Sequence, residues 1–420
     1  MGRKKSVVRR FLLLLIVVVF MGGFLTVKGM VSTQYKKPIV VIHFAHWRVE
    51  DLGVYNQIIR QYERENPGIL VVQDVEDANE YRKNLGEQLN AENAPDLFAT
   101  FPGGDFNTIS ARKAYKDIAG LDFLKQFNPE LLKPGQQNGK QYAVPYQLVY
   151  NIPIYNKEIF EKYNLKSPND WNGFLAICQT LKNNGIIPII LDSEIGFQQF
   201  INPMIMNNLP EPDTLSKVEK GETKLVEPWF VKTLSQFKEL NDRGFFQSDI
   251  PGTKKAGAAA MFAQGKGGML AQGSYIMGTV KQQNPTMRQG LISPITVEAG
   301  QKKYEGIHTA TFLLGINEKT KNYDAVLHFL QYLLKPEIGE RYANATGQLL
   351  TVNGINYQSA ELAEQALWQS KTTLFQPRYM ILIPEVENAI INSIKEVLSG
   401  TTPEVAAQKA QQIVDEVIKK

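Results

Sequence analysis

The sequence predicts an α/β protein built on a parallel sheet covered by helices, and two observations point to this fold class. From residue 37 to residue 99, runs of strand-forming apolar residues alternate with segments of helical periodicity. That order is typical of strand–helix–strand units. The chain also has 420 residues, of which 43% are hydrophobic, and this is enough for a large core and for two domains.

The first predicted elements follow one another closely. Residues 37–47 form a β-branched run bounded by Pro38, which predicts a buried strand. Residues 52–65 carry apolar side chains at helical spacing and stop at Asn66-Pro67-Gly68, so we expect a helix there. A second strand is predicted from Ile69, a helix over 81–91, and a third strand from Pro95.

Two later blocks repeat this style. A helix is predicted over 171–183 with Asp170 as its cap, followed by a strand over 186–190. Amphipathic helices are predicted over 324–334 and over 403–419, the latter capped by Thr402. No long linker separates the domains, so we expect the chain to pass between them more than once. The only cysteine, Cys178, lies at helical spacing among apolar residues and is expected to be buried.

The N-terminus stands apart from the rest of the chain. Residues 1–32 combine a basic start with an apolar run from Phe11 to about Val27, the layout of an export signal that is either cleaved or kept as a membrane anchor. This segment holds six of the 46 Lys and Arg residues and no acidic residue, so the rest of the chain has 40 basic and 42 acidic residues. The basic pI thus belongs to the signal and does not indicate a nucleic-acid-binding surface.

Loops after the first and third predicted strands carry the candidate ligand-binding residues. In open α/β sheets, ligands lie beyond the carboxyl ends of the strands. Aromatic faces can stack on sugar rings, while carboxylates and amides bind hydroxyl groups. For Trp47 a role as a core aromatic is an open alternative, and Asp105 could serve only to hold a turn. The loops contain His46, Trp47, Glu50 and Asp51, and then Phe101, Gly103, Gly104 and Asp105.

A glycine-rich stretch, MFAQGKGGMLAQGSY, covers residues 261–275. It does not match a P-loop, because Gly265-Lys266 is followed by Gly267 and Ala260 stands where the first glycine is required. The third position of a dinucleotide fingerprint is Leu270 and also fails. Glycines permit positive φ and close backbone approach, so we interpret them as chain geometry and expect Lys266 to be an exposed charge.

Several motifs together resemble one family. The stretch GKQYAVPYQLVYNIPIYNKEIFEKYNL from Gly139, PNDWNGF from Pro168, and the glycine-rich stretch occur in the order seen in extracellular solute-binding proteins of ABC sugar importers. That class includes maltodextrin-binding protein. ENPGI, APDLF and GTTPEVAAQKA add further matches, so the resemblance covers about residues 38–420. The chain departs from the pattern in lacking an anchoring cysteine and in having Gly173 where Glu is usual.

The resemblance implies a two-lobed periplasmic-binding-protein fold of the class II type, with the ligand cleft between the lobes. Lobe 1 would comprise 38–143 and 315–349, and lobe 2 would comprise 144–314 and 350–420, with crossings at 142–146, 311–316 and 348–353. No cofactor, metal or catalytic residue is expected. The expected ligand-binding residues are His46, Trp47, Glu50, Phe101, Asp105, Tyr146, Gln147, Tyr150, Trp229, Gly273, Ser274, Tyr275 and His308.

Three functions follow from these observations. The first is a monomeric, extracytoplasmic carbohydrate-binding subunit that delivers sugar to the transmembrane subunits of an ABC permease, held at the membrane surface by its N-terminal segment. The second is a membrane-tethered sugar sensor that passes ligand state to a signalling partner. The third is a carbohydrate hydrolase using carboxylates among Glu50, Asp51 and Asp105, but no catalytic motif fixes their geometry. We therefore expect a binding protein and not an enzyme.

Overall fold

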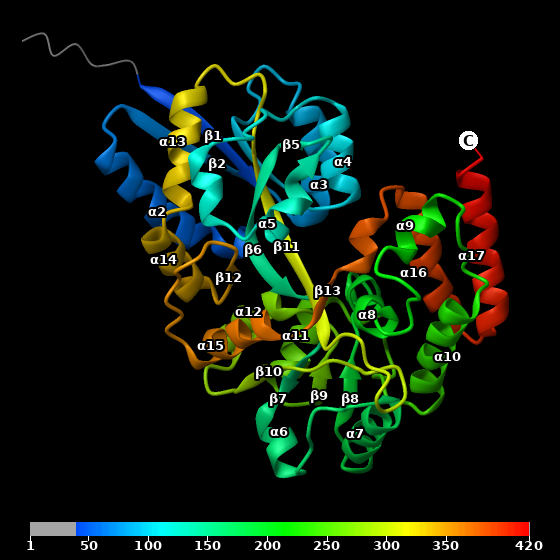
Figure 1. Cartoon of the computed structure of the whole chain (residues 1–420). Helices are drawn as coiled ribbons and strands as arrows, with labels where there is room; N and C mark the ends of the chain where they lie inside the picture. The colour runs from blue at the N-terminus through cyan, green and yellow to red at the C-terminus, as the bar shows by residue number, and fades with distance from the viewer. Residues whose placement is uncertain (1–38, 420) are drawn as a thin grey trace, which may run out of the picture.

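The computed structural model describes residues 39–419, so the predicted export signal or anchor lies outside the described residues. Figure 1 shows two lobes, one above the other, joined by long strands that run through both. Within residues 39–419, none of the helices is both long and apolar enough to cross a membrane. The mixed α/β fold with two lobes is the one that the sequence predicts.

The upper lobe, lobe 1, contains most of a seven-stranded sheet. β1 (Val40–His46) lies between β2 (Ile69–Val75) and β3 (Leu97–Thr100) and pairs with both in parallel. β11 (Gly306–Ile316) pairs antiparallel with β3 and with β6 (Ala143–Tyr150). β12 (Leu349–Leu350) pairs antiparallel with β6, and β13 (Thr373–Phe375) pairs in parallel with the start of β11. The first three strands are parallel as predicted. β11 runs antiparallel to β3 and to β6 because the chain returns from lobe 2, and only β13 adds a further parallel pair among the described strands of this sheet.

Helices cover both faces of this sheet. The prediction for α2 was correct to the residue, and α3 begins earlier than predicted because the Asp77 side chain accepts a hydrogen bond from the amide of Asn79. The helical and hairpin elements of lobe 1 are α2 (Leu52–Glu65), α3 (Ala78–Gln88), α4 (Gly104–Ala111), α5 (Pro129–Leu132), α13 (Tyr323–Leu333), α14 (Pro336–Thr346), η1 (Val49–Asp51), η2 (Asp122–Gln126), η3 (Lys133–Gly135), β4 (Gln136–Gln137) and β5 (Lys140–Gln141).

Lobe 2 has a smaller sheet in the order β10 (Gln289–Leu291), β7 (Ile154–Asn156), β9 (Gly267–Leu270) and β8 (Ile187–Ile190). Asp170 and Thr402 cap α7 and α17 as predicted. The helices are α6 (Lys157–Lys162), α7 (Trp171–Asn183), α8 (Gly196–Ile205), α9 (Thr214–Glu219), α10 (Pro228–Asp242), α11 (Lys255–Ala263), α12 (Met277–Gln283), α15 (Ala360–Leu367), α16 (Pro384–Leu398), α17 (Pro403–Val417), η4 (Ser274–Ile276), η5 (Trp368–Ser370) and η6 (Pro377–Met380).

Each lobe has its own hydrophobic core. Buried side chains form two clusters, one in each lobe. On β6, Tyr146 belongs to the lobe 1 cluster and Leu148 to the lobe 2 cluster; on β11, Ile307 belongs to the lobe 2 cluster and Phe312 to the lobe 1 cluster. Cys178 belongs to the lobe 2 cluster and is fully buried, as expected. The proposed lobe boundaries lie within a few residues of these changeover points, but Tyr146 and residues 312–314, which they place in lobe 2, belong to the lobe 1 cluster.

The crossing strands contain one irregular residue. β6 and β11 pair through seven residue pairs, but the pairing skips Phe312, whose φ of 54° is in the left-handed region. A non-glycine residue in this region costs on the order of 1–3 kcal/mol. The Phe312 ring is fully buried and packs edge-on against Trp47, so its packing offsets this strain.

The glycine-rich stretch lies where a helix ends and a strand begins, and Lys266 is exposed as expected. α11 ends at Ala263, β9 begins at Gly267, and Lys266 between them is exposed. A Cβ at Gly267 would lie 2.5 Å from Ile190 Cδ1, and one at Gly268 would lie 2.6 Å from Leu181 Cδ1. The glycines therefore let β9 pack closely between β8 and α7, and no phosphate is needed to explain them.

Candidate functional site

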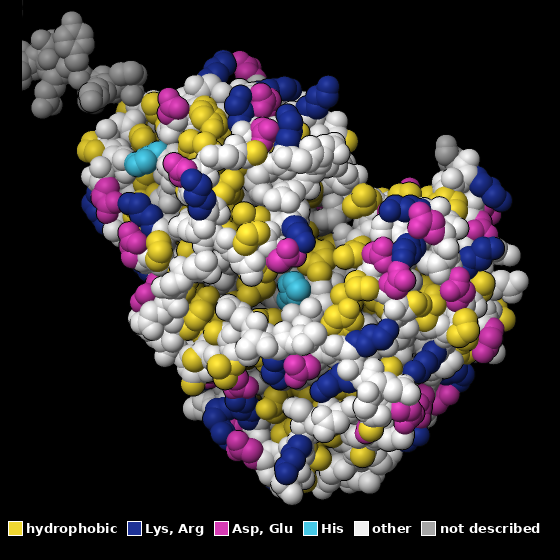
Figure 2. Space-filling view, in the orientation of Figure 1, with side chains coloured by type: hydrophobic (Ala, Val, Ile, Leu, Met, Phe, Trp, Pro, Cys, Tyr) yellow, Lys and Arg dark blue, Asp and Glu magenta, His cyan; other side chains and the backbone are white. Residues whose placement is uncertain are grey.

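The candidate site is the hollow between the lobes, which is visible in the space-filling view (Figure 2). The lobes approach each other where the loop after β3 meets η6. A Cβ at Gly103 would lie 2.7 Å from the carbonyl oxygen of Tyr379, and one at Gly104 would lie 3.1 Å from that of Leu382. Two adjacent glycines therefore let the backbone of lobe 1 meet the backbone of lobe 2.

The lobe 1 side of the site is a stack of flat side chains. The rings of Trp47 and Phe101 are stacked with centroids 3.7 Å apart, and the guanidinium of Arg82 lies 3.9 Å from the Phe101 centroid. Since both groups lie over the same ring at van der Waals distance, they must occupy opposite faces of Phe101. Both faces of Phe101 are therefore covered by protein in this conformation.

Trp47 is only 8% exposed. It also contacts Tyr81 and Phe312, with ring centroids 5.7 and 5.0 Å away. The loops after β1 and β3 do come together, as the parallel-sheet argument predicts. This packing nevertheless favours the alternative in which Trp47 is a core aromatic that supports the site from behind.

Asp105 lies in the first turn of α4 and does not serve as its cap. Its Oδ2 forms an ion pair with Arg82, 2.9 Å from Nε. Its charge also acts across the hollow on Arg378 in η6. Asp105 therefore pairs with Arg82 in its own lobe and lies near enough to Arg378 for its charge to raise that residue's pKa, so the alternative of a purely turn-holding carboxylate is not favoured.

Arg378 is the central charged group on the lobe 2 side. It is 8% exposed, with Nη1 2.8 Å from Glu387 Oε1 and Nη2 3.2 Å from the Tyr379 hydroxyl. Burial lowers the pKa of Arg378, but Tyr379, Glu387 and Asp105 outweigh burial and raise the pKa above its ordinary value. Among residues 39–419 its buried Nε has no hydrogen-bond partner. Arg378 thus stays charged and keeps one donor unused.

Tyr275 lies in η4 on the lobe 2 side of the hollow and is half-buried. Burial raises its pKa, and the nearby charge of Asp192 raises it further, so the phenol stays protonated. Asp192 is itself held by Gln272, whose Nε2 donates to Oδ2 at 2.9 Å. Tyr275 and Tyr379 are both partly exposed; the Tyr379 ring centroid lies 4.7 Å from the guanidinium carbon of Arg378, and Tyr275 is near enough for the charge of Arg378 to lower its pKa.

Gly273 and Ser274 fix the position of Tyr275. The Ser274 hydroxyl accepts a 3.1 Å hydrogen bond from the amide of Tyr150 at the end of β6. A Cβ at Gly273 would lie 2.9 Å from the Tyr150 carbonyl oxygen. The predicted residues Tyr150, Gly273 and Ser274 are therefore brought together, but as buried supports for the hollow.

Tyr146 and Gln147 belong to a buried network at the first crossing. Gln147 Nε2 donates to the Tyr342 hydroxyl at 2.6 Å, and that hydroxyl donates to Asp51 Oδ2 at 2.5 Å. Arg48 Nε donates to the same carboxylate oxygen at 2.7 Å. Tyr146 is fully buried against the Tyr342 ring. These side chains join β6 to lobe 1 and do not line the hollow.

The two predicted histidines occupy different places. His46 is fully buried, and both ring nitrogens are engaged, by Gln73 Oε1 at 3.0 Å and by the Arg48 amide at 3.1 Å. His308 is half-buried, with Nδ1 2.9 Å from Thr373 Oγ1 and its ring 6.0 Å from Phe375. Glu50 is exposed and pairs with Arg48 at 3.2 Å. Of these three, His308 remains the best placed to meet a ligand.

Burial lowers the pKa of His46 to about 4, and the charge of Arg48 lowers it further. In the unfolded chain His46 has its ordinary pKa of 6.5, so between about pH 6.5 and about pH 4 the unfolded state binds more protons than the folded state. We expect the unfolding free energy to fall as the pH drops through this window, by roughly 3 kcal/mol for His46. Urea unfolding at several pH values in this window measures the unfolding free energy. In His46→Gln the unfolding free energy should depend less steeply on pH than in the wild type. The exposed His328→Gln is the control, and an unchanged slope in His46→Gln would contradict the assignment.

Trp229 lies outside the hollow. It is 6% exposed in α10 and packs against Phe230 within the lobe 2 core. We therefore leave it out of the proposed site. The sequence reasoning missed Arg82, Asp192, Gln272, Arg378 and Tyr379. The stretch Gln376-Pro377-Arg378-Tyr379 follows a strand of only three residues, too short for alternation to reveal.

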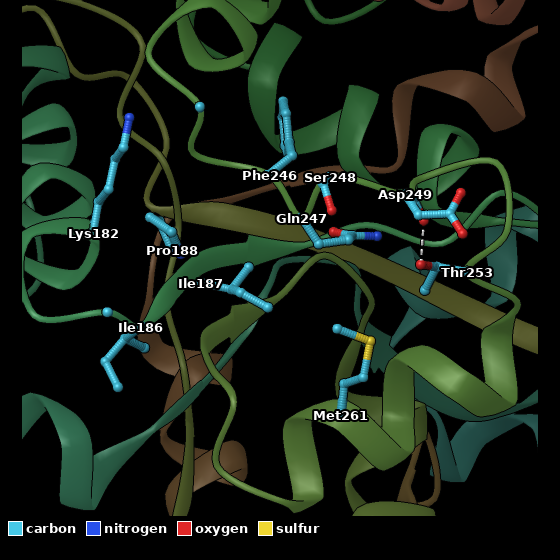
Figure 3. Close-up of a pocket in the computed structure, with 12 residues that line it drawn as sticks. Lys182, Ile186, Ile187, Pro188, Phe246, Gln247, Ser248, Asp249, Thr253 and Met261 are labelled. Atoms are coloured by element: carbon cyan, nitrogen blue, oxygen red, sulfur yellow. Dashed lines mark hydrogen bonds between the residues drawn. The ribbon is translucent and has the colours of Figure 1, made fainter.

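Among the described residues, no group of three or more His, Cys, Asp or Glu side chains is placed to hold a metal ion. A pocket of about 520 Å³ lies at the outer edge of β8, away from the hollow (Figure 3). Its main polar groups already bond within the protein. Lys182 Nζ donates to the Arg243 carbonyl, Gln247 bonds both the amide and the carbonyl of Leu191, and Thr253 donates to the Asp249 carbonyl.

Relatives are found along most of the chain. Residues 57–372 match the family of bacterial extracellular solute-binding proteins. The multiple sugar-binding protein of Streptococcus mutans serotype c is 25% identical over 77% of this chain and 78% of its own length. The melibiose/raffinose/stachyose-binding protein MelE of Bacillus subtilis is 21% identical over 64% of each chain.

Solved structures share the fold. A chitin oligosaccharide binding protein superposes with a TM-score of 0.79 at 18% identity, covering 90% of this chain and 99% of the other. A sugar transporter protein of Bacillus licheniformis in complex with stachyose gives 0.73 at 20% identity, covering 89% and 98%. The two-lobed architecture, the hollow between the lobes and a family match over more than half of its length together show that this chain belongs to the bacterial extracellular solute-binding proteins.

Proposed function

We propose that the chain is the extracytoplasmic carbohydrate-binding subunit of an ABC importer, which captures a sugar or oligosaccharide between its lobes and delivers it to the transmembrane permease subunits. The observation that carries the proposal is the pair of partly exposed rings, Tyr275 and Tyr379, beside Arg378 and facing Asp105 of the other lobe. Flat rings and paired charged donors and acceptors are the groups that a sugar's faces and hydroxyls require.

The mechanism follows from the two-lobe geometry. A ligand that contacts Asp105 on lobe 1 and Tyr275 or Tyr379 on lobe 2 binds the closed form better than the open form. It therefore favours closure by its differential affinity for the two forms. No covalent step is involved. The N-terminal segment would hold the protein at the membrane surface, next to the permease.

The names of the relatives support a sugar as the ligand class. The Streptococcus mutans and Bacillus subtilis relatives are named as sugar-binding proteins. One relative, UgpB of Shigella flexneri, is named as an sn-glycerol-3-phosphate-binding protein, at 23% identity. A ligand panel should therefore contain raffinose, stachyose, chitin oligosaccharides and sn-glycerol 3-phosphate. Tight binding of sn-glycerol 3-phosphate, with no binding of the sugars in the panel, would contradict a carbohydrate ligand.

Replacement of Tyr275 by alanine should weaken the ligand that the panel identifies by about 1–3 kcal/mol, the scale of one buried aromatic side chain. The same loss is expected for Tyr379→Ala. Calorimetric titration measures both, and Tyr163→Ala, at the end of α6 in lobe 2, is the matched control. Small-angle scattering should show a smaller radius of gyration with ligand. Binding without compaction and without loss in Tyr275→Ala would place the site on one lobe.

A further inference from the structure

The two long strands that cross between the lobes are irregular at directly opposite positions. β6 and β11 run through both lobes (Figure 1) and pair antiparallel. Their register places Tyr146 opposite Phe312, and this is the position that the pairing skips. We name Tyr146 and Phe312 the hinge pair. Each of these two residues is held in the present lobe arrangement at a separate cost in free energy.

The hinge pair lies at the boundary between the lobes. Before Phe312, β11 pairs with β13, and beyond Phe312 it pairs with β3 in the sheet of lobe 1. The hydrophobic cores change at the same level. On β6 the lobe 2 cluster begins at Leu148, and on β11 the lobe 1 cluster begins at Phe312. A rotation of one lobe against the other is therefore absorbed at or close to the hinge pair.

The first cost is in the backbone of Phe312. Its φ of 54° lies in the left-handed region, which a residue with a Cβ disfavours. Its ring is fully buried in lobe 1, with the Trp47 and Tyr55 rings 5.0 and 6.4 Å away between centroids. Because lobe 1 holds the ring and the residues that follow, a change in this φ moves the residues before Phe312, which lead to lobe 2. A relative rotation of the lobes therefore acts on this torsion angle.

The second cost is in the side chain of Tyr146. Its ring is fully buried against Tyr342, with the two centroids 5.4 Å apart. The Tyr146 hydroxyl is buried and has no hydrogen-bond partner within residues 39–419. The neighbouring Tyr342 hydroxyl, in contrast, bonds both Gln147 and Asp51. A buried hydroxyl without a partner costs free energy, because the hydrogen bonds that it makes to water when exposed are lost.

We propose that the hinge pair stores strain that opposes closure of the lobes. In the present arrangement the backbone of Gly103 meets that of Tyr379, Phe312 keeps its left-handed φ, and the Tyr146 hydroxyl has no partner. When the lobes separate, Phe312 returns to the extended region and the Tyr146 hydroxyl regains a partner.

This strain favours the open arrangement when no ligand is bound. A ligand in the hollow must then supply the difference through its greater affinity for the closed form. The inference rests on the lobe motion of the proposed function, but it does not depend on the chemical class of the ligand. It can therefore be tested without any sugar.

The first test compares Phe312→Gly with Phe312→Ala. Both variants lose the ring, and they differ in how readily the backbone enters the left-handed region, which glycine does at no steric cost. Electron paramagnetic resonance measures the distance between spin labels on Lys83→Cys in lobe 1 and Gln408→Cys in lobe 2, two exposed positions, without ligand. Cys178 is fully buried, so the labels react with the introduced thiols.

The ratio of closed to open molecules should be at least about fivefold higher in Phe312→Gly than in Phe312→Ala, which corresponds to about 1 kcal/mol. Lys113→Gly and Lys113→Ala are the matched control, because Lys113 has a φ of 55° in the turn after α4, outside both crossing strands. These two variants should give equal ratios. Equal ratios in the two Phe312 variants would overturn the proposal, since the left-handed conformation would then persist in both arrangements.

The second test keeps every ring in place and decides the matter if the Phe312 variants do not fold. Tyr146→Phe removes a hydroxyl that has no partner in the closed arrangement, so the ratio of closed to open molecules should rise about threefold or more. The matched control is Tyr332→Phe on α13, since Tyr332 is 3% exposed and its hydroxyl also lacks a partner among the described residues. This control should leave the ratio unchanged.

An unchanged or lower ratio in Tyr146→Phe would overturn the stored strain while leaving the proposed function intact. A different outcome would overturn both proposals. If the wild type shows a single label distance that no ligand of the panel alters, the lobes do not move.

Discussion

Replacement of Trp47 by alanine should lower the unfolding free energy by about 3–5 kcal/mol, the usual cost of removing a buried tryptophan. The reason is its packing, because the ring stacks on Phe101 and contacts Tyr81 and Phe312. Urea unfolding followed by circular dichroism measures the change. The conservative Trp47→Phe keeps a ring on Phe101 and should cost clearly less than Trp47→Ala.

The affinity of folded Trp47→Ala separates the two roles weighed for this residue. If Trp47 supports the site from behind, the folded variant should bind ligand within about tenfold of wild type, or about 1.4 kcal/mol. Calorimetry below the midpoint of unfolding measures this affinity. An unchanged stability together with a larger loss of affinity would instead mean that the ring stacks on the ligand, as the sequence alone suggested.

Replacement of Gly104 by valine should weaken ligand binding by at least about tenfold, or about 1.4 kcal/mol. A side chain there would meet the Leu382 carbonyl oxygen, which belongs to the backbone and cannot rotate away. The closed form is then disfavoured, and affinity falls with the population that can close. Small-angle scattering should show a larger radius of gyration in the ligand-bound variant than in the ligand-bound wild type.

Gly53→Val is the matched control for this experiment. Gly53 lies in the first turn of α2, as Gly104 lies in the first turn of α4, and an added Cβ at Gly53 meets no atom within 4 Å. It should bind ligand and compact like wild type. Normal compaction in Gly104→Val would show that the contact between the glycine loop and η6 is not part of the closed state.

The fold could be predicted where one face of an element is buried and its ends carry clear signals. α2 is an example, since its apolar side chains all face the core and Asn66-Pro67-Gly68 ends it. The antiparallel half of the large sheet could not be deduced from periodicity. β6 is buried along its whole length and β11 along most of it, so their sequences lack the alternation that reveals a strand exposed on one face.

The candidate site was predicted only in part, for a related reason. The rule that ligands lie beyond the carboxyl ends of parallel strands located the loops with Trp47 and Asp105. It does not tell which side chain of a loop faces solvent, and Trp47 faces the core. Arg378 was missed because its position depends on η6 packing under lobe 1, a contact between residues nearly 280 positions apart in the chain, such as Gly103 and Tyr379.

The burial of Cys178 makes the protein a ready scaffold for an optical reporter. The chain has one cysteine, and burial raises the pKa of its thiol above the ordinary value, so it resists alkylation in the folded state. A cysteine introduced at Leu382, a half-exposed position beside the closing contact, would then be the sole reactive thiol in the described part of the chain. A dye attached there would change its fluorescence when the lobe 1 loop docks, and closure could be followed in real time without labelling the ligand.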